Sequence, residues 1–196
     1  MAKARFFYAL RPDAAAADEL AAIAVQAATR WGGRALAAAD IHLTLAFVGM
    51  HPLEAQPALA AVLQGLPARI ETVLALSELG SFGHGVLWIG PPADPHATAP
   101  AAGAFAHRLA QTIRERLRAA QIEFDDRPLK LHATLVRGAH ALDRRTREDD
   151  TGAVAPAPHR VVARAWSVAL GASASDSTPQ RRYRWWTPPT SRTDPT

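Results

Sequence analysis

Three observations in the sequence predict an α+β fold with two similar lobes. Strand-like and helix-like patterns alternate along the 196 residues. Each half of the chain carries a helical stretch and then a strand in which a histidine and a threonine lie two residues apart, in the sequences IHLTL and LHATL. A proline-rich connector over 90–100 separates the halves. This weak internal repeat is placed as a duplicated lobe requires, and we expect the boundary between the halves at the connector.

The first elements follow from apolar runs and the residues that end them. The run RFFYAL over 5–10 predicts a buried strand, which Pro12 terminates. A helix is expected over 13–30, where alanine, leucine and isoleucine recur at helical spacing and Asp13 is a suitable N-cap. The run IHLTLAFV over 41–48 predicts a second strand, closed by a glycine.

The segment before the connector predicts one helix and two strands. An apolar pattern at helical spacing covers 53–66, and Pro57 is compatible with its first turn. Strands are expected over 70–79 and 86–89, and the glycines within 80–85 indicate a turn between them.

The segment after the connector begins with a clear amphipathic helix. Its apolar stripe consists of Phe105, Leu109, Ile113 and Leu117. Strands are then expected over 130–136, 161–170 and 182–186. Residues 188–196 are polar and proline-containing, so we expect a mobile tail after a single domain over 1–187.

The composition excludes several classes of protein. Hydrophobic residues make up 48% and charged residues 20% of the chain, which is ordinary for a soluble globular protein and too apolar for a disordered one. Cysteine is absent, which excludes disulfides, thiol catalysis and thiolate zinc sites. No apolar stretch has the length of a membrane span, and the opening residues lack a signal-peptide pattern. We therefore expect a cytoplasmic protein with no membrane association, and a monomer.

The cationic side chains are almost all arginine. Only Lys3 and Lys130 are lysines among the 22 cationic residues, and the formal net charge is +4. Codon bias explains this pattern, since the chain is also rich in alanine and proline. A phosphate-rich partner is the functional alternative, because the guanidinium group binds phosphate with two hydrogen bonds. Composition alone favours codon bias.

The two His-x-Thr strands carry the strongest chemical signal. Side chains alternate between the faces of a strand, so His42 shares a face with Thr44, and His132 shares one with Thr134. Two imidazoles that titrate near neutral pH can serve as acid and base in the hydrolysis of a phosphodiester. The hydroxyls can bind the phosphate oxygens. A single histidine of this kind is most often structural, but two copies with the same apolar neighbours favour catalysis.

The chain resembles the 2H phosphoesterase superfamily, which is defined by two His-x-Thr motifs. Within it, the sequence is similar to the bacterial RNA 2′,3′-cyclic phosphodiesterases, also called the LigT or 2′-5′ RNA ligase family. The resemblance rests on the segments RFFYALRP, IHLTLAFVG, VLWIG and LHATLVRG and on the closing strand at Tyr183–Trp186. It implies one bilobal domain whose lobes interleave in sequence. Their antiparallel sheets would face a central groove, with the helices outside.

The resemblance also implies a reaction and residue roles. The expected reaction opens a terminal 2′,3′-cyclic phosphate on RNA to a 2′-phosphate, without metal or cofactor, and allows weak reverse 2′-5′ ligation. His42 would be the general acid, His132 the general base, and Thr44 and Thr134 the phosphate ligands. The residues by themselves leave the acid and base exchangeable. The partners would be RNA 3′ ends carrying the cyclic phosphate, on single strands or on halves of tRNA.

Three further residues are candidates for substrate contact. Arg137 follows the second motif, but on an ideal strand it would face away from Thr134 unless a bulge or the strand end redirects it. Phe82, in a glycine-flanked loop, and Tyr8 could stack on RNA bases. The remaining histidines lack a metal-binding spacing, so no metal site is expected, and no phosphate-binding glycine loop indicates ATP use.

Two other functions stay open at this point. The substrate could be a small cyclic nucleotide rather than RNA, or the chain could be a non-catalytic module that binds RNA 3′ ends. Binding alone would not require two titratable groups, which argues against the second alternative.

Overall fold

The structure is a computed structural model and describes residues 2–92, 103–139, 160–178 and 181–188. Residues 93–100 of the expected connector and 189–196 of the expected tail lie outside the described residues. In the described part of the chain, no helix combines the length and the apolar character needed to cross a membrane.

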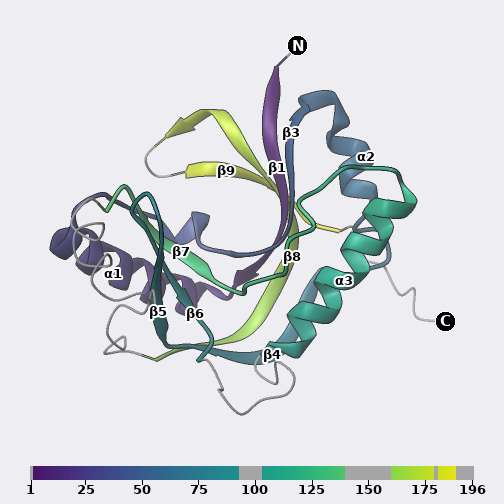
Figure 1. Cartoon of the computed structure of the whole chain (residues 1–196). Coiled ribbons are helices and arrows are strands. Elements are labelled where there is room, and N and C mark those ends of the chain that lie inside the picture. Colours follow the sequence, from purple (N-terminus) through teal and green to yellow (C-terminus); the bar gives the residue numbers. More distant parts are fainter. Residues whose placement is uncertain (1, 93–102, 140–159, 179–180, 189–196) are drawn as a thin grey trace.

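The chain alternates strands and helices as expected for an α+β protein (Figure 1). The strands are β1 (Lys3–Pro12), β2 (Arg34–Ala35), β3 (Leu43–Pro52), β4 (Arg69–Leu76), β5 (Glu78–Phe82), β6 (Val86–Gly90), β7 (Ala133–Arg137), β8 (Val161–Thr178) and β9 (Arg181–Trp186). The α-helices are α1 (Ala14–Trp31), α2 (Gln56–Ala61) and α3 (Ala104–Ala119), and two 3₁₀ turns are η1 (Ala38–Asp40) and η2 (Leu53–Ala55).

The first helix begins and ends where its sequence predicts. The Asp13 carboxylate accepts a hydrogen bond from the Ala16 N–H, so Asp13 caps the N-terminus. Gly32, with a φ of 75°, follows the last turn, and its N–H donates to the Ala28 carbonyl.

Two elements differ from the sequence prediction. The helix expected over 53–66 is shorter, because its start is the 3₁₀ turn η2 and residues after Ala61 form tight i→i+3 turns. The expected turn over 80–85 begins later, because Gly80 lies within β5. A Cβ atom at Gly80 would come within 2.1 Å of the Trp88 indole, so this glycine permits close packing in a strand rather than a turn.

All strands join into one antiparallel sheet with the order β4-β8-β1-β3-β7-β6-β5, and β9 pairs with β8 while β2 pairs with β7. The sheet has two halves that meet between β3 and β7, where only Leu43 and Ala133 pair. The two antiparallel sheets that the resemblance implies are therefore the two halves of one continuous sheet. This joint lies directly after both histidines, so the two motifs run side by side in opposite directions, and each histidine lies across from the threonine of the other motif.

The two halves interleave in sequence. β5 and β6 belong with β7, whereas β8 and β9 return to the half that contains β1 and β3. β6 and β7, on either side of the connector, pair with each other. The expectation that the connector marks the boundary between the halves is therefore wrong. Pairing across a sheet depends on the matching of distant strands, which a proline-rich stretch does not reveal.

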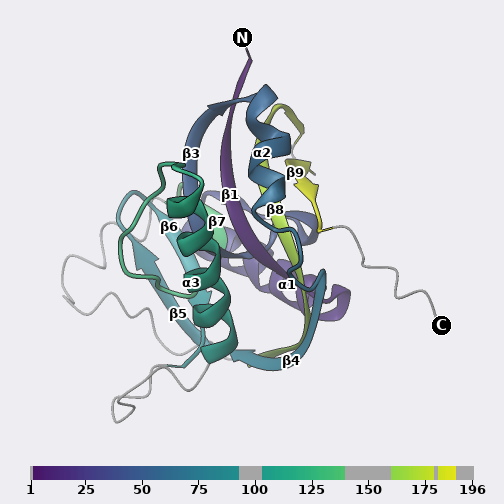
Figure 2. The same cartoon turned by 90° about the vertical axis from the view of Figure 1, so that its right-hand side faces the viewer.

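The helices lie on different sides of the sheet and enclose the core. α1 packs against β2, β7 and β8, while α3 lies beside α2 on the other side of the molecule (Figures 1 and 2). The Arg116 guanidinium of α3 donates to the carbonyls of Val62 and Gln64, which ties α3 to the segment after α2. The apolar stripe predicted for α3 is buried at Leu109, Ile113 and Leu117.

Candidate active site

Both histidines of the motifs are held in the same way by the backbone. His42 directly precedes β3, and its Nδ1 lies 2.6 Å from the Asp40 carbonyl oxygen. His132 directly precedes β7, and its Nδ1 lies 2.8 Å from the Lys130 carbonyl oxygen. A carbonyl oxygen only accepts, so each Nδ1 carries the proton and donates it. In the neutral ring, Nε2 is then the nitrogen that can take up a proton.

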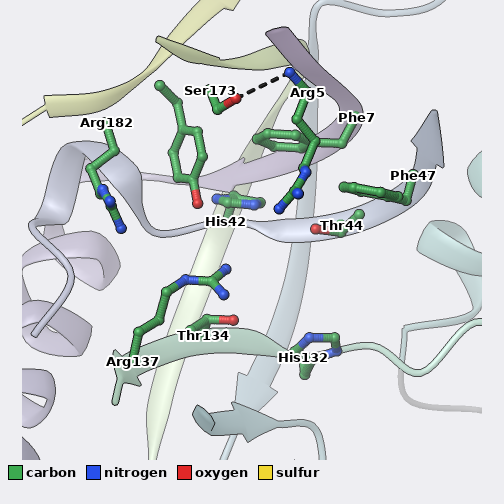
Figure 3. A pocket seen from close by; sticks show the side chains of 11 residues that line it. Arg5, Phe7, His42, Thr44, Phe47, His132, Thr134, Arg137, Ser173 and Arg182 are labelled. Atoms are coloured by element: carbon green, nitrogen blue, oxygen red, sulfur yellow. Dashed lines mark hydrogen bonds between the residues drawn. The ribbon is translucent and has the colours of Figure 1, made fainter. Parts of the chain in front are cut away.

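A pocket of about 460 Å³ brings the two motifs together (Figure 3). Both histidines and both threonines of the motifs line it, as does Arg137. The other lining residues are Arg5, Phe7, Phe47, Ser173, Arg182 and Tyr183. The Arg137 guanidinium points into the space between the two motifs (Figure 3).

A bulge in each motif strand sets which later residue faces the pocket. In β7, Leu87 pairs with Val136 and Trp88 with Thr134, so Leu135 is an extra residue. The extra residue reverses the alternation, and Arg137 shares a face with Thr134. The bulge thus redirects Arg137 into the pocket.

The first motif has its bulge at the equivalent position. In β3, Tyr8 pairs with Ala46 and Ala9 with Thr44, so Leu45 is the extra residue. Phe47, three residues after Thr44, therefore lies on the same face as that threonine. Arg137 lies three residues after Thr134 and shares a face with it in the same way. The two motifs repeat one backbone geometry but present different side chains at its end.

Aromatic rings surround His42. The Phe7 ring stacks on the imidazole with centroids 4.8 Å apart, and Tyr183 and Trp185 approach edge to face at 5.2 and 5.3 Å. Only 9% of His42 is exposed. The pKa of His42 is lowered to about 4, mainly by burial and in addition by the positive charge of Arg137, while the hydrogen bond to Asp40 opposes the shift. His42 is therefore neutral at pH 7 in the free protein.

His132 lies in a more open setting with a cation nearby. The Phe82 ring meets it edge to face at 4.8 Å, and the Lys130 ammonium lies 4.1 Å above the Trp88 ring beside it. Burial lowers the pKa of His132, and the charges of Lys130 and Arg137 act in the same direction.

Asp40 organises the wall next to His42. Its carboxylate is buried and accepts hydrogen bonds from the backbone N–H groups of Arg182, at 2.9 Å, and Tyr183, at 3.3 Å. Its own carbonyl accepts from His42. Asp40 thus holds β9 and His42 in one arrangement. Burial raises the pKa of this carboxyl group. Sequence reasoning did not find Asp40, because its partners are more than 140 residues away.

A second groove of about 490 Å³ continues from the pocket and shares Thr44, Phe47 and His132 with it. Phe82 lines this groove rather than the pocket itself. Phe47 and Phe82 are 36% and 37% exposed and are the exposed aromatic side chains among the described residues.

The expectation of a substrate contact at Tyr8 is wrong. Tyr8 is fully buried, and its hydroxyl donates to the Leu59 carbonyl at 2.8 Å, away from the pocket. The neighbouring Phe7 faces the pocket instead, because successive side chains of β1 alternate between faces. The sequence contains this alternation but does not reveal which face is the core, since both carry aromatic rings.

The pocket offers two imidazoles, two hydroxyls and arginine to a single anion. Such a set can bind a phosphate group and move protons to and from it. Within the described part of the chain, no three His, Asp or Glu side chains are grouped closely enough to hold a metal ion.

Comparison with known proteins gives structural matches only. No protein-family model matches the chain, and no curated protein matches it. The crystal structure of Escherichia coli LigT complexed with 3′-AMP superposes with a TM-score of 0.67 at 22% identity and covers 96% of this chain and 99% of that one. A phosphoesterase crystal structure gives 0.65 at 23% identity, covering 95% and 99%. Protein TT0787 of Thermus thermophilus gives 0.53 at 22%, covering 93% and 94%. The chain therefore has the fold of E. coli LigT over almost its whole length.

Proposed function

We propose that this protein is a phosphodiesterase that opens the terminal 2′,3′-cyclic phosphate of RNA to a 2′-phosphate. The observation that carries the proposal is the meeting of both His-x-Thr motifs at one pocket, with equivalent ring anchors and equivalent bulges. The fold likeness supports it, because crystal structures of LigT contain 3′-AMP, ATP and phosphate.

The first step of the proposed reaction is binding of the phosphate. The hydroxyls of Thr44 and Thr134 donate to its non-bridging oxygens, and the Arg137 guanidinium neutralises its charge. As the phosphorus becomes five-coordinate, charge grows on the same oxygens, so these donors bind the transition state more strongly than the substrate.

The second step transfers two protons. Nε2 of His132 takes a proton from water, and the water oxygen forms a bond to phosphorus. The bond from phosphorus to O3′ breaks, and His42 gives its Nε2 proton to O3′. The 2′-oxygen keeps its bond, so the product is a 2′-phosphate with a free 3′-hydroxyl. Exchange with solvent then returns His132 to the neutral form, and His42 takes up a new proton when the next substrate binds.

Substrate binding supplies the proton that the acid needs. His42 is neutral in the empty pocket, but an anionic phosphate beside it raises its pKa and favours uptake of a proton from solvent. The resulting imidazolium lies over the face of the Phe7 ring, where the ring quadrupole stabilises it.

The terminal base lies in the adjoining groove in this proposal. Phe47 and Phe82 are exposed there, and a nucleobase stacks on such rings without sequence preference. Lys130, which also lines the groove, adds positive charge beside His132.

A product assay tests the proposed function. The purified protein is incubated with an oligoribonucleotide that ends in a 2′,3′-cyclic phosphate, with EDTA present, and the 2′- and 3′-phosphate products are separated. We expect the 2′-phosphate from the wild type and from His51→Ala, a control at the far end of β3. His42→Ala and His132→Ala should each lose roughly 10²- to 10⁴-fold in rate while keeping the circular dichroism of the fold. A wild type that produces no 2′-phosphate would refute the proposal.

A further inference from the structure

Three arginines from different elements gather beside the reacting pocket. Arg34 of β2 and Arg137 of β7 are direct partners in an antiparallel pair, so their side chains leave the same face of the sheet. Arg182 of β9 lines the pocket with Arg137, and both lie on the side opposite Phe47 (Figure 3). We call Arg34, Arg137 and Arg182 the arginine cluster.

Close packing fixes the cluster in the free protein. Gly33, with a φ of 87°, lies so near β7 that a Cβ atom would come within 2.7 Å of the Arg137 carbonyl oxygen. The Asp40 carboxylate holds the Arg182 backbone. The strands that carry the cluster are therefore set by backbone contacts and do not depend on the guanidinium groups.

The cluster concentrates like charge, which the nearby Asp40 carboxylate offsets only in part. Like charges directly opposite in a sheet destabilise the pairing. Among the described residues, none of the three arginines forms an ion pair with a carboxylate within 4.0 Å. Burial lowers the pKa of the half-buried Arg34, and the charges of Arg182 and Arg137 lower it further, while Tyr183 and Asp40 act in the opposite direction. An anion at this place would relieve the repulsion.

The reacting phosphodiester carries one negative charge, and Arg137 is placed to neutralise it. Arg182 lines the pocket on the side opposite Phe47 (Figure 3), and Arg34 is not among the lining residues, so these two arginines are available to a second anion. We propose that Arg34 and Arg182 bind the phosphate that joins the terminal nucleotide to the preceding one, and that the enzyme therefore prefers oligonucleotides to cyclic mononucleotides. This inference rests on the proposed function.

The chemistry of ribose supports this placement. The base leaves C1′, next to C2′, whereas the chain to the 5′-phosphate leaves C4′, next to C3′. The base and the preceding phosphate thus extend in opposite directions from the cyclic phosphate. With the base in the groove beside Phe82 and His132, the preceding phosphate points toward Tyr183 and Arg182, where His42 also lies. O3′, the oxygen that His42 would protonate, is on that same side.

Binding measurements test the inference without requiring turnover. The ligands are adenosine 2′-phosphate, the dinucleotide ApA ending in a 2′-phosphate, and the same dinucleotide with a neutral methylphosphonate at the linking position. Titration calorimetry gives the dissociation constants at several salt concentrations. We expect the wild type to bind the charged dinucleotide on the order of tenfold more tightly than the methylphosphonate.

The variants separate charge from folding. Arg34→Gln should remove most of the preference for the charged dinucleotide and leave adenosine 2′-phosphate binding unchanged. For the charged dinucleotide, we plot the logarithm of the association constant against the logarithm of the salt concentration. The magnitude of this slope should be smaller by about 0.7 in Arg34→Gln than in the wild type, which is the value for one phosphate contact on a single strand. Arg34→Lys, which keeps the charge, and Arg108→Gln, on the exposed surface of α3, should retain the preference.

Two failures are distinguishable. A wild type that binds both dinucleotides equally, or an Arg34→Gln variant that weakens all three ligands alike, would overturn the second phosphate site and leave the proposed function intact. A wild type that binds none of the ligands and forms no 2′-phosphate would refute the proposed function and this inference with it.

Discussion

The two motifs share a backbone design and differ in their surroundings. In both, the histidine Nδ1–H donates to the carbonyl two residues earlier, and a leucine bulge follows the threonine. Around His42 the neighbours are aromatic rings, and around His132 they include Lys130 and a more open groove. The shared part orients the rings, and the part that differs sets the protonation of each. A duplicated motif can therefore supply two unlike groups.

The largest expected effect separates the two histidines by role. On a 4-nitrophenyl phosphodiester the leaving group departs without a proton, so a missing general acid matters little there. We expect His42→Ala to recover most of its roughly 10²- to 10⁴-fold loss on this substrate, while His132→Ala does not. The measurement is kcat/KM on both substrates. The opposite pattern would exchange the acid and base roles, and equal losses would contradict any division of roles.

A second prediction concerns protonation and stability. The pKa of His42 is about 4 in the folded protein, below the unfolded value near 6.5, so the unfolded state binds the proton first. The contribution of the neutral His42 ring to the free energy of unfolding is therefore fully present above about pH 6.5. As the pH falls toward 4, this contribution decreases by about 3 kcal/mol. His132 adds to the loss in the same direction. Urea unfolding at several pH values measures this dependence.

The control for this experiment removes the titrating group. His42→Gln should reduce the dependence between pH 6.5 and 4 and leave the part that His132 contributes, whereas His51→Gln should keep it in full. An NMR titration that places the His42 midpoint at or above 6.5 in the free protein would contradict the role of burial. Added inorganic phosphate should move the midpoints of His42 and His132 upward, because an anion favours both cationic rings.

The smallest expected effect compares the residues that follow the two bulges. Arg137→Gln removes a charge-assisted hydrogen bond to the phosphate and should lower kcat/KM by roughly 10- to 100-fold. Phe47→Leu keeps an apolar side chain at the equivalent place and should cost less than about tenfold, since only stacking is reduced. Steady-state kinetics on the cyclic phosphate oligonucleotide decide this. Equal losses would show that the two positions do not have the different roles proposed for them.

Much of the fold and the centre of the site could be predicted from the sequence. The strands β1, β3, β6 and β7 and the helices α1 and α3 lie close to their expected ranges. The α+β class is confirmed, as is the meeting of the two motifs in one pocket. These predictions succeed because apolar periodicity and capping are local properties of a sequence.

Other features could not be predicted in this way. Phe7 lines the pocket and Tyr8 is buried, although both are aromatic and adjacent. The glycine at position 80 resembles a turn signal, but it accommodates the Trp88 indole within the sheet. In each case the deciding neighbour is distant in sequence, and a residue type alone does not identify it.

The sequence by itself determined the chemical groups of this protein: two imidazoles, each with a hydroxyl two residues later on an apolar strand. Only the tertiary structure decided how they are used. The Leu43–Ala133 joint brings the motifs together, the bulges turn Phe47 and Arg137 toward the pocket, and Asp40 holds β9 over His42. The physical reason is that strand register and burial depend on pairing between distant segments, and burial sets the proton affinity of each histidine.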